Sequence, residues 1–124
     1  MTEPSIARPG GITYIQLPTI DAEGSATFYE AVFGWTIRQR GTPHVSFADA
    51  SGYVIGAFIA DRVTSRDAGV LPYIYVNSVE DTVATIRKNG GEIVREPYRE
   101  GDLTVATFRD VAGNVMGVWQ MGPV

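Results

Sequence analysis

The 124-residue sequence predicts an α+β fold made of two similar modules, each ordered strand, helix, strand, strand, strand. Three observations predict it: a duplicated strand–turn–strand segment, a strand and an amphipathic helix before each copy, and a length that suits one domain. We expect one domain over residues 1–124, with module one at about 11–60, a linker at about 61–69 and module two at about 70–121.

The duplicated segments are residues 47–58 and 108–119, which share five identical positions at a constant offset of 61. In each copy an Asp is followed three residues later by a Gly, at Asp49 and at Asp110, which is typical of a type I turn. Two hairpins can resemble each other by coincidence. Here the order and lengths of the flanking elements agree as well, which favours duplication.

In module one, residues 12–17 are rich in strand formers and predict the first strand. Apolar residues at helical spacing follow Asp21, and Gly34 ends that pattern, as glycine commonly does after a helix. Residues 35–40 predict the second strand, and the hairpin at 47–58 supplies the last two.

Module two repeats this order. Residues 71–76 predict a strand, Ser78 is a candidate N-cap, and a helical stripe follows until Gly90 and Gly91. Residues 92–95 predict the next strand, and residues 108–119 form the hairpin.

Composition excludes several functional classes. The net charge is −4 and no run of Lys or Arg occurs, so no nucleic-acid partner is expected. No apolar stretch is long enough to span a membrane, and residues 1–11 lack the apolar segment of a signal peptide, which favours a cytoplasmic location. The chain has no cysteine, which excludes disulfides, thiolate metal sites and cysteine nucleophiles.

Motifs occur at both ends of the chain: LPTID at 17–21 and FYEAVFGW at 28–35 near the start, and an Asp–Gly–Gly–Trp–Gln pattern over residues 110–120 near the end. The first two resemble the LP-x-x-D…FY-x-x-x-FGW subgroup, and the last resembles the closing D-x-x-G-x-x-x-G-x-WQ stretch, of the vicinal oxygen chelate superfamily, which includes glyoxalase I, extradiol dioxygenases and bleomycin-resistance proteins. The resemblance covers about residues 11–121. It implies a curved mixed sheet whose concave face holds the ligand, and a homodimer. It implies no single function, because the superfamily contains isomerases, dioxygenases, lyases and binding proteins.

The metal enzymes of this superfamily carry one ligand in the first strand of each module and one, typically Glu, in the last. Distances from the helix signals and the duplicated pattern put these positions at Tyr14, Leu71 (with Tyr73 as the alternative), Gly56 and Gly117. Leucine and glycine offer no donor atom, and tyrosine is a poor ligand for the usual divalent ions. The one histidine, His44, falls in a different strand. We therefore expect neither a metal nor another cofactor.

Strand alternation predicts which residues face the cleft. The candidate ligand-binding residues are mostly aromatic, polar or small: Tyr14, Gln16, Gly56, Phe58, Leu71, Tyr73, Tyr75, Gly117 and Trp119, with Val54 and Val115 on the same face. The opposite parity is uniformly aliphatic or sulfur-containing: Ile15, Leu17, Ile55, Ala57, Ile74, Val76, Met116 and Val118. Rings that stack, with hydroxyl and amide groups between them, suit a planar ligand, and the two glycines would leave space for it. Alternatively, the aromatic side chains fill the cleft or bury a dimer interface.

Catalytic groups are scarce on this face. No Asp or Glu falls on it, and the pair His44 and Ser46 has no evident orienting acid. The charged run at 95–100 is most simply a solvated hairpin connection, or a rim of the cleft.

The favoured function is a metal-independent binding protein that sequesters an aromatic or polycyclic molecule, as the drug-binding, antibiotic-resistance members do. One alternative is a metal-independent lyase or isomerase that uses Tyr14 or Tyr73 as acid or base. The other is a structural or interaction protein without a ligand.

Overall fold

The computed structural model describes residues 8–64 and 69–123. The chain divides into two compact units, residues 1–62 and 63–124, which we call module one and module two. The boundary falls inside the predicted linker at 61–69, of which residues 65–68 lie outside the described residues, as do residues 1–7. That the two modules make one domain stays a prediction. No helix of the described segments is long and apolar enough to cross a membrane.

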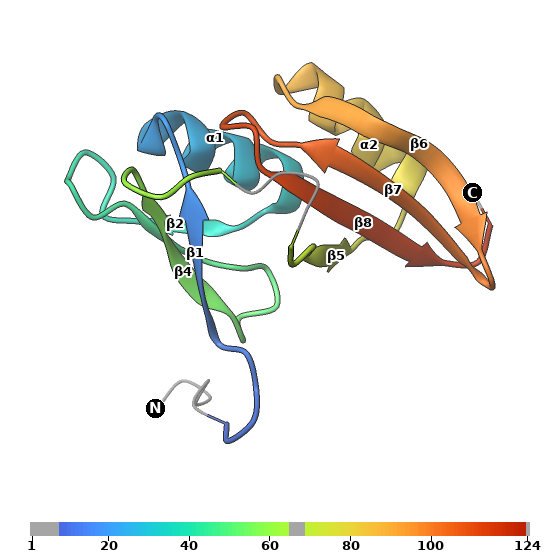
Figure 1. Ribbon diagram of the computed structural model, residues 1–124, viewed down its shortest axis with the longest axis horizontal. Coiled ribbons are helices and arrows are strands. Elements are labelled where there is room, and N and C mark those ends of the chain that lie inside the picture. The colour runs from blue at the N-terminus through green and yellow to red at the C-terminus, as the bar shows by residue number, and fades with distance from the viewer. Residues whose placement is uncertain (1–7, 65–68, 124) are drawn as a thin grey trace. The chain divides into compact units, whose positions relative to one another are not determined.

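Module one has the predicted order of elements (Figure 1). They are β1 (Tyr14–Pro18), α1 (Ala22–Phe33), β2 (Thr36–Arg38), β3 (Ser46–Ala48) and β4 (Ile55–Ile59). The sheet order is β1-β4-β3-β2, with β1 and β4 parallel and the other pairs antiparallel. Gly34 ends α1 as predicted: it has φ of 72°, a left-handed conformation that glycine adopts without steric cost.

Stacked aromatic rings make up much of the core between α1 and this sheet. Tyr29 of α1 is fully buried, and its ring centroid lies 4.4 Å from that of Trp35. Phe47 of β3 lies 4.6 Å from Trp35 and 5.2 Å from Phe58 of β4. The FYEAVFGW motif therefore supplies ring packing in the core. Trp35, which the sequence assigned to the second strand, precedes β2 and is buried.

Module two contains β5 (Tyr73–Tyr75), α2 (Val79–Lys88), β6 (Glu92–Glu100), β7 (Leu103–Arg109) and β8 (Val115–Met121), with sheet order β5-β8-β7-β6. Figure 1 shows α2 covering one face of this sheet. Ser78 is the N-cap, as predicted, and its Oγ accepts a hydrogen bond of 3.1 Å from the N–H of Asp81. The prediction that residues 95–100 form a hairpin connection is wrong, because these residues continue β6.

The two hairpins differ by one residue in register. Both turns have the predicted bond, from Gly52 N–H to the Asp49 carbonyl and from Gly113 N–H to the Asp110 carbonyl. The next pair closes differently: the N–H of Asp49 donates to Val54, five residues on, whereas that of Asp110 donates to Asn114, four residues on. Residues before the two turns are therefore structurally equivalent at the sequence offset of 61, whereas residues after the turns are shifted by one position in the strand pairing.

This slip reverses the face of every residue in one strand, because side chains alternate along it. In module two Phe108 pairs with Met116, and Gly117 and Trp119 lie in register with Tyr73 and Tyr75, as predicted. In module one Phe47 pairs with Gly56 instead.

The predicted placement of Gly56 and Phe58 is therefore wrong. They pair with Ile15 and Leu17 and lie on the face toward α1, where Phe58 packs beside Tyr29. Tyr14 and Gln16 share the other face with two residues that the sequence assigned to the core, Ile55 and Ala57.

Candidate functional site

The face of the module-two sheet opposite α2 carries four aromatic rings, which we call the ring face: Tyr73, Tyr75, Tyr98 and Trp119. Tyr73 is 43% exposed and Tyr75 is 53% exposed, whereas Trp119 and Tyr98 are half-buried. The rings of Tyr75 and Trp119 meet edge to face, with centroids 4.9 Å apart. Three of the predicted ligand-binding rings thus lie together.

Gly117 lies beneath the ring of Tyr73. A Cβ placed on Gly117 would collide with ring atoms Cδ2, Cε2 and Cζ of Tyr73. The absence of a side chain lets the ring lie directly against the sheet backbone. The expectation that Gly117 leaves space for a guest is therefore wrong, since Tyr73 fills it. At Gly56 a Cβ would meet the ring of Phe47 and the carbonyl oxygen of Ile15, so that space is filled as well.

Two bulges in β6 add side chains that the sequence analysis did not include in the site. The register shifts between Ile93 and Arg95 and again between Arg95 and Tyr98. In a regular strand residues 95 and 98 would point to opposite faces, whereas the bulged strand pairs them with Thr107 and Val105 of one face. The guanidinium carbon of Arg95 lies 3.5 Å from the ring centroid of Tyr98, a cation–π contact. Pro97 was the available signal, because proline inside a strand favours an edge or a bulge.

Tyr73 has a phenol that favours the protonated form. Partial burial, mainly, and the neighbouring Tyr98 and Glu100 raise its pKa, which the closeness of Arg95 only partly offsets. Tyr73 is thus a hydrogen-bond donor at neutral pH. By its register Glu100 of β6 also lies on this face, which corrects the expectation that no carboxylate does.

Module one carries a hollow of about 400 Å³, which lies within the usual size range of ligand pockets. We call it the module-one hollow. Its lining includes Tyr14, Arg38, His44, Ser46, Ile55 and Ile59. Gly56 and Phe58 also border it, although their strand positions lie on the helix face. The hollow therefore brings together His44 and Ser46, the pair for which the sequence indicates no orienting acid.

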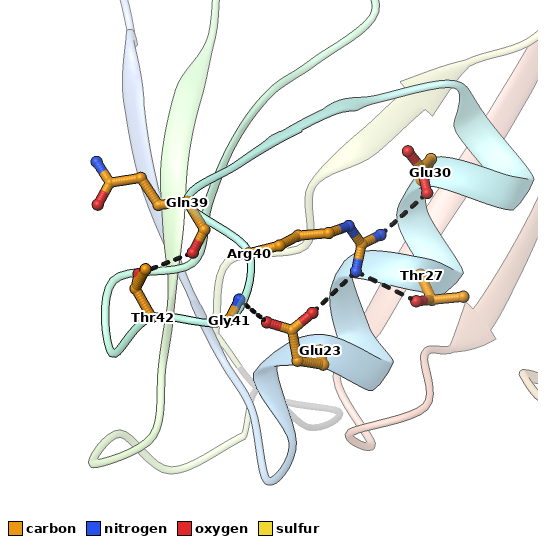
Figure 2. A network of polar contacts seen from close by, with 7 residues as sticks. All are labelled: Glu23, Thr27, Glu30, Gln39, Arg40, Gly41 and Thr42. Atoms are coloured by element: carbon orange, nitrogen blue, oxygen red, sulfur yellow. Dashed lines mark hydrogen bonds and ion pairs between the residues drawn. The ribbon is translucent and has the colours of Figure 1, made fainter.

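An ion-pair network fixes the loop that forms one wall of this hollow (Figure 2). Arg40 donates from Nη1 to Glu23 at 3.0 Å and from Nη2 to Glu30 at 2.9 Å, both on α1. The N–H of Gly41 donates to the second oxygen of Glu23 at 2.7 Å. These contacts tie the β2–β3 loop to the helix.

Thr42 then positions His44 in the same loop. Its hydroxyl donates to the carbonyl of Gln39 at 2.8 Å and accepts from the N–H of His44 at 3.1 Å. Gln39 has φ of 58°, a left-handed conformation uncommon outside glycine, which redirects the chain directly after Arg38. Consequently Arg38 remains at the hollow, while Arg40 reaches α1.

This network predicts a pH dependence. The hydrogen bond from Gly41 and the charge of Arg40 lower the pKa of Glu23 below its ordinary value of 4.5. Its contribution to loop order is complete above that value and is lost as the pH falls through the lowered pKa. An NMR titration of the Gly41 amide should therefore show a transition below pH 4.5. Glu23→Gln should abolish it and Glu30→Gln should retain it. A midpoint at or above the ordinary value would contradict the prediction.

The residues present do not match the metal site that the superfamily resemblance implies. On the faces opposite the helices, the first-strand and last-strand positions are Tyr14 and Ala57 in module one, and Tyr73 and Gly117 in module two. None supplies an imidazole or a carboxylate, which divalent ions prefer. Across residues 8–64 and 69–123 no group of three or more His, Cys, Asp or Glu side chains is arranged to hold a metal.

Two further candidates are not part of the ring face. Gln16 is exposed, and its Oε1 accepts a hydrogen bond of 3.4 Å from Arg62, which follows β4. Leu71 precedes β5 instead of lying within it, and is 36% exposed.

Known proteins resemble this chain in sequence or in fold. The anthracycline biosynthesis protein DnrV of Streptomyces peucetius is 24% identical over an alignment of length 132, which covers 92% of this chain but 48% of DnrV. This chain thus spans about half the length of that relative. The solved structure of TnmS3, an antibiotic binding protein from Streptomyces sp. CB03234, has a TM-score of 0.71 at 19% identity and covers 91% of this chain and 97% of its own. The fosfomycin resistance protein FosX from Listeria monocytogenes has a TM-score of 0.75 at 14% identity, with 91% and 94% covered.

These structural likenesses establish the fold. The model of the Glyoxalase/Bleomycin resistance protein/Dioxygenase superfamily matches residues 11–118, which is most of the chain. The paired βαβββ modules have the matching element order. The chain belongs to the glyoxalase, bleomycin resistance protein and dioxygenase superfamily.

Proposed function

We propose that this protein binds a small molecule with a planar aromatic group on the ring face, without a metal ion. The observation that carries the proposal is the set of four rings on one sheet face, of which Tyr73 and Tyr75 are about half exposed. Aromatic side chains offer a large apolar surface and lose little conformational freedom when a ligand stacks on them. The phenol of Tyr73 and the guanidinium of Arg95 supply polar contacts at its edge.

The relatives support a binding role. TnmS3 is described as an antibiotic binding protein, and DnrV as an anthracycline biosynthesis protein. The first description names an antibiotic and the second names anthracyclines, which contain fused aromatic rings of the kind that four clustered rings suit. We therefore expect a polycyclic natural product as the ligand class, sequestered by this chain.

Catalysis that uses Tyr73 as a general base finds less support. A general base must be deprotonated near neutral pH, and the environment of Tyr73 raises its pKa instead. Tyr73 is better suited to donate a hydrogen bond to a bound oxygen atom. The homodimer expected from the family resemblance stays a prediction.

Binding should be visible in tryptophan emission. We expect daunorubicin, as a polycyclic probe, to quench the half-buried Trp119 and to raise the melting temperature. Tyr75→Ala should weaken binding about two- to tenfold, the usual worth of one aromatic pair. Tyr53→Ala is the matched control, since Tyr53 is 47% exposed but lies in the module-one turn.

The same titration on protein dialysed against EDTA should give an unchanged Kd. A Kd that rises on metal removal would contradict metal independence. No binding by daunorubicin or by a panel of other polycyclic quinones would instead favour the ligandless alternative.

A further inference from the structure

The module-one hollow has a charge character opposite to that of the whole chain. The protein carries a net charge of −4, yet the described residues that line the hollow include Arg38 and His44 and no Asp or Glu. A concave site lined by one sign of charge concentrates ligands of the other sign. The hollow therefore favours an anionic group.

Arg38 is the cation available to it. Within the described residues, 8–64 and 69–123, no carboxylate forms an ion pair with Arg38, whereas Arg40 is held by Glu23 and Glu30. The turn at Gln39 separates the two arginines, so that the acidic side chains of α1 neutralise only one of them. The exposed guanidinium of Arg38 keeps its donors for a ligand.

The sheet surface beside Arg38 carries two small side chains, one of them polar. Arg38 pairs with Ser46, and Ser46 pairs with Ala57, so these three residues form one row across β2, β3 and β4 on the face opposite α1. The methyl group of Ala57 occupies little room in this row. Apolar surface follows in the neighbouring rows of β4, from Ile55 and Ile59, which also line the hollow.

We propose that the module-one hollow is a second binding site, which takes a small organic acid. The carboxylate is held by Arg38, whose planar guanidinium matches its two oxygens, with the Ser46 hydroxyl and the His44 imidazole as further donors. The apolar body of the acid lies against Ile55 and Ile59. This site uses no residue of the ring face and does not depend on aromatic binding there.

A matched pair of probes isolates the carboxylate. Cyclohexanecarboxylate should bind and shift the NMR resonances of residues 38, 44, 46 and 55–59, whereas neutral cyclohexanecarboxamide should bind about tenfold or more weakly. Arg38→Gln should weaken binding of the acid about ten- to hundredfold, as expected for a hydrogen bond to a charged group. Arg38→Lys should fall between, because it keeps the charge but loses the planar fork.

Arg99→Gln is the charge-matched control, because Arg99 is exposed in module two and donates to the carbonyl of Gly101. It should leave the affinity unchanged. Equal binding of acid and amide, an effect of Arg99→Gln as large as that of Arg38→Gln, or no binding of the acid would each overturn the proposal. Both probes lack an aromatic ring, so the result of this test does not depend on whether daunorubicin binds the ring face.

Discussion

Gly56→Ala is expected to lower the free energy of unfolding by about 3 kcal/mol, the upper part of the usual range for overpacking a core. The new Cβ would collide with the backbone oxygen of Ile15 and with the ring of Phe47. The oxygen belongs to the strand paired with β4, and Phe47 is buried between Trp35 and Phe58, so neither can move freely. Urea unfolding followed by circular dichroism measures the change.

Gly117→Ala is the matched variant, at the position equivalent by sequence. The three atoms nearest to its Cβ all belong to the ring of Tyr73, which is 43% exposed and can rotate away. We expect a loss below about 1 kcal/mol, because an exposed side chain can adjust without disturbing the packed interior. Displacement of Tyr73 should instead weaken binding of daunorubicin. Equal destabilisation by the two substitutions would contradict the register slip between the modules.

Asp110→Ala is expected to lower the free energy of unfolding by about 3 kcal/mol, since it removes a buried carboxylate that accepts three hydrogen bonds. The Asp110 carboxylate accepts from the N–H groups of Ala112 and Asn114, at 3.0 and 2.9 Å, and from Nδ2 of Asn114 at 3.0 Å. Asn114 is 1% exposed, so water cannot replace these bonds. Thermal unfolding should show a fall of about 4 °C for each kcal/mol in a chain of this size.

Asp49→Ala tests whether burial is the cause. Asp49 occupies the same turn position and accepts from the N–H of Gly52 at 3.0 Å and from Ser51 at 2.7 Å in exposed surroundings, and from the half-buried N–H of Val54 at a longer 3.4 Å. Solvent can satisfy these donors, so the loss should not exceed about 1 kcal/mol. A loss equal to that of Asp110→Ala would mean that turn geometry, and not buried hydrogen bonding, sets the cost.

The register slip could not be read from the duplicated pattern. Both copies keep Asp and Gly at the same spacing, and the difference comes from the following residue. The side chain of Asn114 turns inward and bonds to Asp110, and the shorter closure pairs these two residues. Tyr53, the corresponding residue, stays exposed beneath the guanidinium of Arg8, and the strand closes one residue later.

Strand alternation also could not predict the polar residues of the two candidate sites. Arg95 and Tyr98 share a face only because β6 is bulged, and a bulge is set by its pairing with β7. Arg38 and His44 line one hollow because Arg40 and Thr42 hold the intervening loop. Neither arrangement has a periodic signal.

The sequence by itself determined the elements and their order: the strands, Gly34 and Ser78 at the helix ends, and the paired Asp–Gly turns. These depend on local backbone preferences and hydrogen bonds between residues close in the chain. It also located the rings of Tyr73, Tyr75 and Trp119 on one face, because β5 and β8 alternate regularly. Only tertiary structure decided that Gly56 and Phe58 belong to the core and that Ala57 does not. The cause is one residue of hairpin closure, whose position depends on which side chain the protein can bury beside the turn.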